Sequence, residues 1–284
     1  MTKILACVDG STYAESVCDH AAWAAERLGV PVDLVHALGR RETSSRAIDF
    51  SGNLEFGERE ALLAELSELD EKKSKVSVRR GRLLLDQAMG RVKARGVPIV
   101  ERHLRNGDVA DAIGDMEAEA RLVVIGKRGE AADFAKGHLG SNLERVIRAS
   151  SKPVLVASRA FRPIRRFMVA FDGGRSSGTI VEKLAASPLL TGVPCELFMV
   201  GEPTGDAGER LGEAQRQLKA AGYEVTVKTA NGDADELIAE RVGQDGIDLL
   251  VMGAYGHSRI RRLIVGSTTT QIIQSCAIPV LVIR

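Results

Sequence analysis

Short apolar runs alternate with amphipathic stretches along the chain. Runs such as Val32 to Ala37 and Leu122 to Gly126 are rich in valine, isoleucine and leucine with little polar alternation, which is typical of strands buried on both faces of a parallel sheet. The stretches between these runs, such as Thr12 to Leu28, place apolar residues at helical spacing. The alternation predicts an α/β fold with helices on both faces of a parallel sheet.

This succession of elements occurs twice. Both halves close on the sequence Pro-Val-Leu-Val, beginning at Pro153 and Pro279, and in both a Gly-Ser pair precedes that sequence at the same distance. A short polar stretch around Pro163 interrupts the pattern of strands and helices, and its proline blocks the continuation of a helix. We place the boundary between the halves there. We therefore predict two tandem doubly wound parallel five-stranded sheets with flanking helices, in domains that span residues 1–159 and 164–284.

The first half carries an insertion, at about residues 40–95, that the second half lacks. Leu62, Leu66 and Leu69 recur there at helical spacing among many charged residues, which predicts one or two long amphipathic helices. Charged faces of helices are usually solvated. We therefore expect the insertion to shield the sheet, with a dedicated partner-binding arm as the alternative.

Composition and charge exclude several classes of partner. Lys and Arg number 39 against 38 Asp and Glu, so no overall field attracts nucleic acid or an anionic membrane. The apolar start of the chain is too short for a signal peptide and no segment has a membrane-spanning length. We expect a cytoplasmic protein that binds neither nucleic acid nor membrane. The four cysteines form no metal-binding pattern, so they are expected to pack as small hydrophobic residues.

The second half contains a candidate phosphate site. Nine residues separate Gly253-x2-Gly256 from Gly266-Ser267-Thr268, which stands at the start of a predicted helix. A helix N-terminus offers unpaired N–H groups and a positive dipole to an anion, and glycines let the backbone approach phosphate oxygens. Hydroxyl, imidazole and guanidinium donors in the same loop strengthen this interpretation; they belong to Ser267, Thr268, His257 and Arg259.

The predicted ends of neighbouring strands place further residues beside this loop. Ligands of open α/β sheets bind beyond the carboxyl ends of the strands. Asp172, followed by Gly173, ends the first strand of the second half, and Val200 ends the second strand. Asp172 or its backbone could contact a purine edge, and Val200 could pack against its face. An aspartate at such a position is also a common turn residue, which is the alternative.

Together these features resemble the universal stress protein family. The resemblance is carried by Gly-x2-Gly-x9-Gly-Ser, by the aspartate in Val-Ala-Phe-Asp-Gly and by the terminal Pro-Val-Leu-Val strand. It implies an adenine nucleotide alpha hydrolase-like fold, a cytoplasmic stress-response function and binding of ATP, AMP or ADP. Members that bind ATP use positions that match Asp172, Val200, Gly253, Gly256, Gly266, Ser267 and Thr268.

The resemblance also implies dimerisation through the last strand of each domain. In a fused tandem chain this contact would form internally, so Pro153 to Ser158 is expected to meet Pro279 to Arg284 across a pseudo-twofold axis. A further homodimer of two whole chains is possible but not required.

The first half departs from the family pattern. Ten residues rather than nine separate its glycine pairs, Ala37 replaces the larger Val200, and Glu130 and Asp133 add negative charge that Lys127 and other basic residues only partly offset. We predict that the second half is the nucleotide site and that the first half is weaker. Its equivalent residues are Asp9, Ala37, Gly126, Gly129, Gly140, Ser141 and Asn142.

Catalysis lacks its usual signatures. The chain contains no P-loop, Rossmann or zincin motif, no Ser-His-Asp arrangement and no evident general base. Asp9 and Asp172 could hold Mg²⁺ beside phosphates, although a metal usually needs a further ligand. The sequence therefore predicts regulatory nucleotide binding with no catalytic residue and no resident metal. The alternatives are a slow ATPase or phosphotransferase, and a nucleotide-free scaffold that binds a protein or a small apolar ligand.

Overall fold

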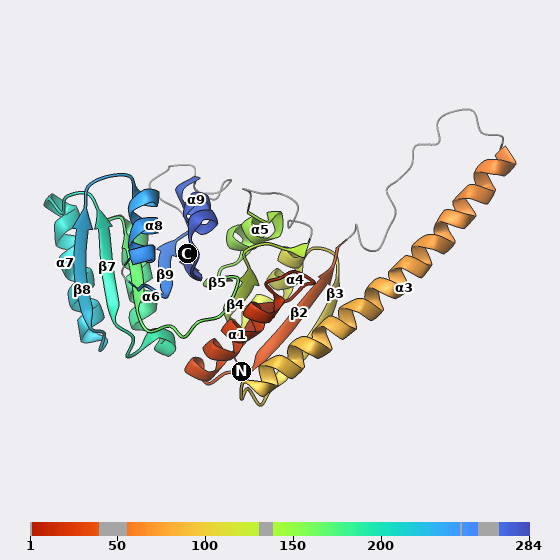
Figure 1. Ribbon diagram of the computed structural model, residues 1–284, viewed down its shortest axis with the longest axis horizontal. Coiled ribbons are helices and arrows are strands. Elements are labelled where there is room, and N and C mark those ends of the chain that lie inside the picture. The colour runs from red at the N-terminus through yellow and green to blue at the C-terminus, as the bar shows by residue number, and fades with distance from the viewer. Residues whose placement is uncertain (1, 40–55, 131–138, 245, 255–266) are drawn as a thin grey trace.

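The computed structural model describes residues 2–39, 56–130, 139–244, 246–254 and 267–284 (Figure 1). The first half contains β1 (Lys3–Cys7), α1 (Ala14–Leu28), β2 (Val32–Leu38), α3 (Phe56–Ala94), β3 (Val100–Asn106), α4 (Val109–Met116), β4 (Ala120–Gly126), α5 (Ser141–Ala149) and β5 (Val154–Ala157). The second contains β6 (Phe167–Phe171), α6 (Arg175–Ala185), β7 (Cys195–Val200), α7 (Gly205–Ala220), β8 (Val225–Ala230), α8 (Ala234–Gln244), β9 (Leu249–Gly253), α9 (Ser267–Ser275) and β10 (Val280–Ile283).

The strands form one continuous ten-stranded sheet in the order β3-β2-β1-β4-β5-β10-β9-β6-β7-β8. Within each half the five strands are parallel, as predicted, and the halves join where β5 and β10 pair antiparallel, with Leu155 opposite Leu281. This pairing confirms the expected contact between the last strands. The two predicted sheets therefore merge into one, because pairing β5 with β10 satisfies two strand edges that would otherwise be exposed.

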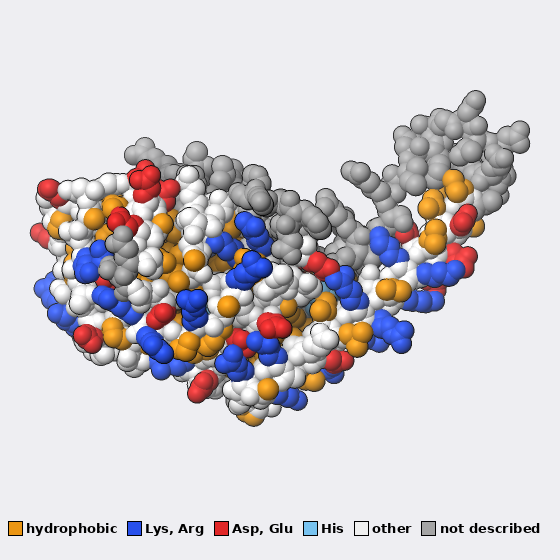
Figure 2. All heavy atoms as spheres, viewed as in Figure 1, with side chains coloured by type: hydrophobic (Ala, Val, Ile, Leu, Met, Phe, Trp, Pro, Cys, Tyr) orange, Lys and Arg blue, Asp and Glu red, His pale blue; other side chains and the backbone are white. Residues whose placement is uncertain are grey.

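The described part of the inserted segment, from residue 56 onward, forms one helix of 39 residues, α3. Its last part packs on the sheet and on α1 through buried Leu85, Ala88 and Val92. Gly81 allows a close approach, since a Cβ there would lie 2.8 Å from the His36 ring. The rest of α3 runs out from the body (Figures 1 and 2). The expectation that the insertion shields the sheet therefore holds only for its C-terminal part.

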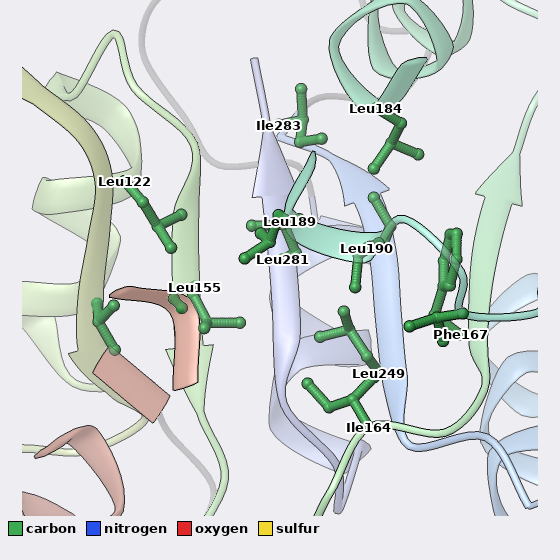
Figure 3. Packing of buried hydrophobic residues seen from close by; sticks show 14 of the residues in the cluster. Leu122, Leu155, Ile164, Phe167, Leu184, Leu189, Leu190, Leu249, Leu281 and Ile283 are labelled. Atoms are coloured by element: carbon green, nitrogen blue, oxygen red, sulfur yellow. The ribbon is translucent and has the colours of Figure 1, made fainter. Parts of the chain in front are cut away.

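Two hydrophobic layers cover the two faces of the sheet. One contains buried residues of α1, α3, α6 and α7, and the other contains buried residues of α4, α5, α8 and α9. Both layers continue across the junction of the halves, where Leu155, Leu281 and Leu189 lie close together (Figure 3). The four cysteines are buried and unpaired within these layers, as predicted. None of the helices in the described part of the chain combines the length and apolar composition that crossing a membrane requires.

Each half also buries one carboxylate near the start of its second strand. Asp33 on β2 lies 2.8 Å from the Lys3 ammonium and 3.0 Å from His103 Nε2. Glu196 takes the equivalent place on β7, and its oxygens lie 2.7 Å from Arg241 Nε and 3.0 Å from Arg166 Nη2. Buried carboxylates are tolerated when they are paired, so these contacts are part of the framework of each half.

Candidate functional site

The strand ends of the second half converge as predicted. Phe171 of β6 pairs with Met199 of β7, and β6 also pairs in parallel with β9. Asp172, Val200 and Gly253 therefore lie at one edge of the sheet, at the switch point where β6 has β7 on one side and β9 on the other.

Part of the predicted second-half site lies outside the described residues. The backbone of Ser267 and Thr268 begins α9, which agrees with the predicted helix start. The side chains of these two residues lie outside the described part of the chain. So do four whole residues of the predicted site, Gly256, His257, Arg259 and Gly266.

Asp172 closes a turn at the entrance to α6. One oxygen of its carboxylate accepts a hydrogen bond from the Gly174 N–H at 2.8 Å and another from the Ser177 hydroxyl, while the Asp172 N–H donates to Ser177 Oγ at 3.1 Å. Asp172 therefore has the role of a turn residue, which was the alternative interpretation of its position. Asp172 is nevertheless exposed at the carboxyl edge of the sheet, where a ligand can reach it.

Gly173 has a backbone that requires glycine. Its φ is 69°, and a Cβ would lie 3.0 Å from Ala207 Cβ. Arg210 Nη1 donates to the Gly173 carbonyl at 2.6 Å. Gly173 is therefore fixed beside Asp172 by conformation, by close packing and by a charged hydrogen bond.

The equivalent residues of the first half surround a cavity of about 160 Å³. It lies at the carboxyl ends of β1, β2 and β4, which is the corresponding switch point. Ser141 begins α5, and its side chain is exposed. The other six predicted residues line the cavity, namely Asp9, Ala37, Gly126, Gly129, Gly140 and Asn142.

The Asp9 carboxylate ties two loops together in this half. Its oxygens accept hydrogen bonds from the Ser11 N–H at 3.0 Å and from the Glu130 N–H at 3.2 Å. A Cβ at Gly129 would lie 3.1 Å from the same carboxylate, and a Cβ at Gly126 would lie 2.8 Å from Tyr13 Cβ. Both glycines of the first pair are thus required by close approach.

The charge of Glu130 is offset by a residue of the inserted helix. Its carboxylate forms an ion pair with Arg80 of α3, and both side chains are partly exposed. The sequence predicted net repulsion of a phosphate by Glu130. That repulsion is weaker than expected, because Arg80 brings a compensating positive charge to the same loop.

Lys127 does not serve the first-half cavity. Its ammonium donates to the carbonyl oxygens of Gln274 at 2.7 Å and Cys276 at 2.9 Å, at the C-terminal end of α9. Burial lowers the pKa of this amine. The sequence assigned Lys127 to charge compensation near its own loop, whereas the structure places it in a contact between the two halves.

His36 is a cavity residue that the sequence analysis does not single out. It is buried, it lines the cavity, and its Nδ1 donates to the Val8 carbonyl at 2.8 Å. Its place next to Ala37 at the carboxyl end of β2 is the signal that could have identified it. Asp108, another lining residue, caps α4 by accepting from the Ala110 N–H at 2.8 Å and pairs with Arg145 of α5.

Comparison with known proteins gives consistent matches over the whole chain. The model of the universal stress protein family matches residues 1–158 and 163–284. A universal stress protein of Synechocystis sp. is 37% identical over 287 residues, covering 100% of both chains. One from Mycolicibacterium smegmatis is 23% identical over 301 residues, covering 99% of this chain and 96% of that one. The crystal structure of a universal stress protein from Archaeoglobus fulgidus covers 99% of this chain and 98% of its own, with a TM-score of 0.73 and 20% identity.

Proposed function

The chain belongs to the universal stress protein family, and on that premise we propose that it binds ATP or another adenine nucleotide, mainly in its second half, as a regulatory ligand in the cytoplasm. The observation that carries the proposal is the shared edge of the sheet at which Asp172, Val200 and Gly253 lie. The glycine-rich stretch between β9 and α9 begins at that edge and leads to a helix N-terminus.

Each residue of the second-half site has a chemical role in this proposal. The N-terminus of α9 faces the phosphates with unpaired N–H groups, and Gly253, Gly256 and Gly266 leave room for the phosphate oxygens. The nucleoside is contacted by Asp172 and by Val200. The turn through Gly173 fixes the position of Asp172. Donors for the phosphates come from Ser267, Thr268, His257 and Arg259. Mg²⁺ would accompany the phosphates of ATP as their counter-ion.

The first half is the weaker site in this proposal. Ala37 offers less surface to a base than Val200, and the cavity of about 160 Å³ is smaller than the roughly 300 Å³ at which ligand pockets begin. The Arg80 ion pair removes part of the charge argument, so the expected asymmetry between the halves rests on the smaller Ala37 and on the length of the loop between the glycine pairs. A nucleotide in the first half would bind less tightly rather than be excluded.

Binding is favoured over hydrolysis by the environment of the aspartates. Asp9 and Asp172 both accept backbone hydrogen bonds in turns, so part of each carboxylate is engaged in holding its turn. A slow ATPase would need a base to activate water. One universal stress protein has been solved in complex with cAMP; its TM-score of 0.36 to this chain is too low to carry weight, so the proposal rests on the residues of the site.

Two measurements on the full chain test the proposal. Mass spectrometry of small molecules released by heating the purified protein should detect an adenine nucleotide. Isothermal titration with ATP, ADP and cAMP should show binding, with one tight site per chain. Absence of any released nucleotide, together with no heat and no thermal shift on adding each of the three, would favour the scaffold alternative. Release of ADP over many turnovers would favour the enzyme.

A further inference from the structure

The projecting helix α3 exposes an apolar stripe at seven-residue spacing. Leu62, Leu69, Val76 and Leu83 follow one another at that interval. The last three are 52%, 65% and 57% exposed. A seven-residue period keeps apolar side chains on one slowly turning stripe, which is the pattern of helices that pair with another helix. Figure 2 shows hydrophobic side chains recurring along the projecting helix.

The stripe points away from the body of the protein. Leu85, Ala88 and Val92 form the face of α3 that docks on the sheet. Leu83 lies two residues before Leu85, which is about 200° around the helix axis, and it is exposed although this part of α3 is docked. The stripe and the docking face are therefore separate surfaces, and a partner can occupy the stripe without displacing the sheet.

The charges along α3 are divided into two blocks. Residues 62–71 contain four acidic side chains and no basic one, whereas residues 72–82 contain six basic side chains and no acidic one. At the boundary, Lys72 pairs with Glu68 and Lys75 with Glu71, each at 2.6 Å. These pairs are solvent-exposed within one helix and contribute little energy, so both blocks remain strongly charged surfaces.

We propose that two copies of this chain associate through their α3 helices, packed antiparallel along this stripe. An antiparallel partner sets the acidic block of each copy against the basic block of the other, whereas a parallel partner sets like charges side by side. The arrangement is self-complementary about a twofold axis, as a dimer of identical chains requires. A second copy therefore fits this surface in both shape and charge.

The positions between the stripe residues suit a moderate, reversible contact. Leu66 adds an apolar residue and Lys73 falls at the next equivalent place, whereas Arg80, one heptad further, is paired with Glu130 of the body. Long basic side chains can cover apolar surface with their stems while their charged ends reach water or an acidic partner. The stretch from 62 to 83 is roughly three heptads, or about 33 Å long. The dimer should accordingly depend on protein concentration.

The more usual family contact is already used within the chain. β5 and β10 pair with each other, so the last strands are not available to a second copy. The α3 dimer is independent of the nucleotide site, because its stripe lies on the outward side of the helix. Its test therefore needs no ligand, and its failure would leave the proposed nucleotide binding intact.

Sedimentation velocity over a range of protein concentrations tests the dimer. Wild type should show a reversible monomer–dimer equilibrium, and Leu69→Ser with Val76→Ser should weaken association at least tenfold. The matched control, Ser67→Ala with Ser74→Ala, alters two uncharged positions of α3 that lie off the stripe; it should dimerise like wild type. Circular dichroism of all three proteins verifies that α3 remains helical.

Salt and charge reversal test the orientation. Because the antiparallel contact joins opposite charges, raising the salt concentration should weaken it, whereas a parallel contact would be strengthened. Glu65→Lys with Glu68→Lys leaves two acidic and two basic side chains in residues 62–71, which removes the net negative charge of that block, and it should weaken association without touching the stripe. A monomer at all concentrations, a dimer that survives the stripe substitutions, or a dimer that strengthens with salt would each overturn the proposal.

Discussion

The ammonium of Lys127 lies 2.7 Å from the carbonyl oxygen of Gln274. This contact joins the glycine loop of the first half to the last turn of α9, the helix whose N-terminus belongs to the proposed nucleotide site of the second half. Carbonyl groups at a helix C-terminus lack partners within the helix, and a cation there also interacts favourably with the helix dipole. Lys127 thus stabilises α9 from the opposite half of the molecule.

Replacing Lys127 by methionine should lower the free energy of unfolding by about 1.5–3 kcal/mol, because two carbonyl groups lose a charged donor. Urea denaturation of the full chain measures the change. Lys219→Met, at an exposed position near the end of α7, is the control and should cost less than about 0.5 kcal/mol. Equal stability of the two variants would mean that the contact between the halves contributes nothing.

Replacing Gly266 by valine should abolish tight ATP binding, since a branched side chain would occupy the space of a phosphate oxygen. Gly140→Val is the matched substitution in the first half. A Cβ at Gly140 makes only ordinary contacts, at 3.5 Å or more, so that variant should fold and retain the tight site. Isothermal titration measures both. The reverse outcome, with binding lost only in Gly140→Val, would place the main site in the first half.

Replacing Glu196 by glutamine should destabilise the protein by about 3 kcal/mol, because it leaves the Arg166 and Arg241 guanidinium groups without their buried counter-charge. The Glu196 side chain is 0% exposed, whereas the Arg166 and Arg241 side chains are 33% and 20% exposed, so water can compensate only on the side of the arginines. Urea denaturation compares this variant with Glu202→Gln, at an exposed position. A loss below 1 kcal/mol for Glu196→Gln would show that the pairing contributes little.

Acid should destabilise the protein through His20. This residue is fully buried, its Nδ1 lies 2.7 Å from the Ser16 carbonyl, its ring packs on Phe161, and burial lowers its pKa from 6.5 to about 4. Between those pH values the unfolded chain binds a proton that the folded chain does not. Stability therefore falls as pH drops from about 6.5 to 4, by roughly 3 kcal/mol at most.

The contribution of His20 is isolated by comparison with His20→Leu. Other groups also titrate in this range, so the free energy of unfolding is measured at pH 7 and pH 4.5 for both proteins. The difference between the two pH values should be smaller in the variant. An identical pH dependence in both proteins would show that folding does not lower the pKa of His20.

The repeat and the strand pattern made most of the fold predictable. Buried parallel strands need continuous apolar sequence, and that requirement is local, so runs such as Val32 to Ala37 could be recognised without knowing their neighbours. The pairing of Pro153 to Ser158 with Pro279 to Arg284 was predictable because the family resemblance implies dimerisation through the last strand, and a fused pair of domains can make that contact within one chain. The glycines at 126 and 129 were also identifiable, since close backbone approach tolerates few other residues.

Contacts between distant side chains were decided by the tertiary structure. Arg80 and Glu130 are 50 residues apart, and Lys127 and Gln274 are 147 apart. Nothing in their local sequence distinguishes them from solvated charges, because the choice of partner depends on how the helices pack against the sheet. For the same reason the sequence placed Lys127 at its own loop and did not identify His36 as a cavity residue. The pattern of residues determined the elements and their order, while packing in three dimensions determined which charges meet.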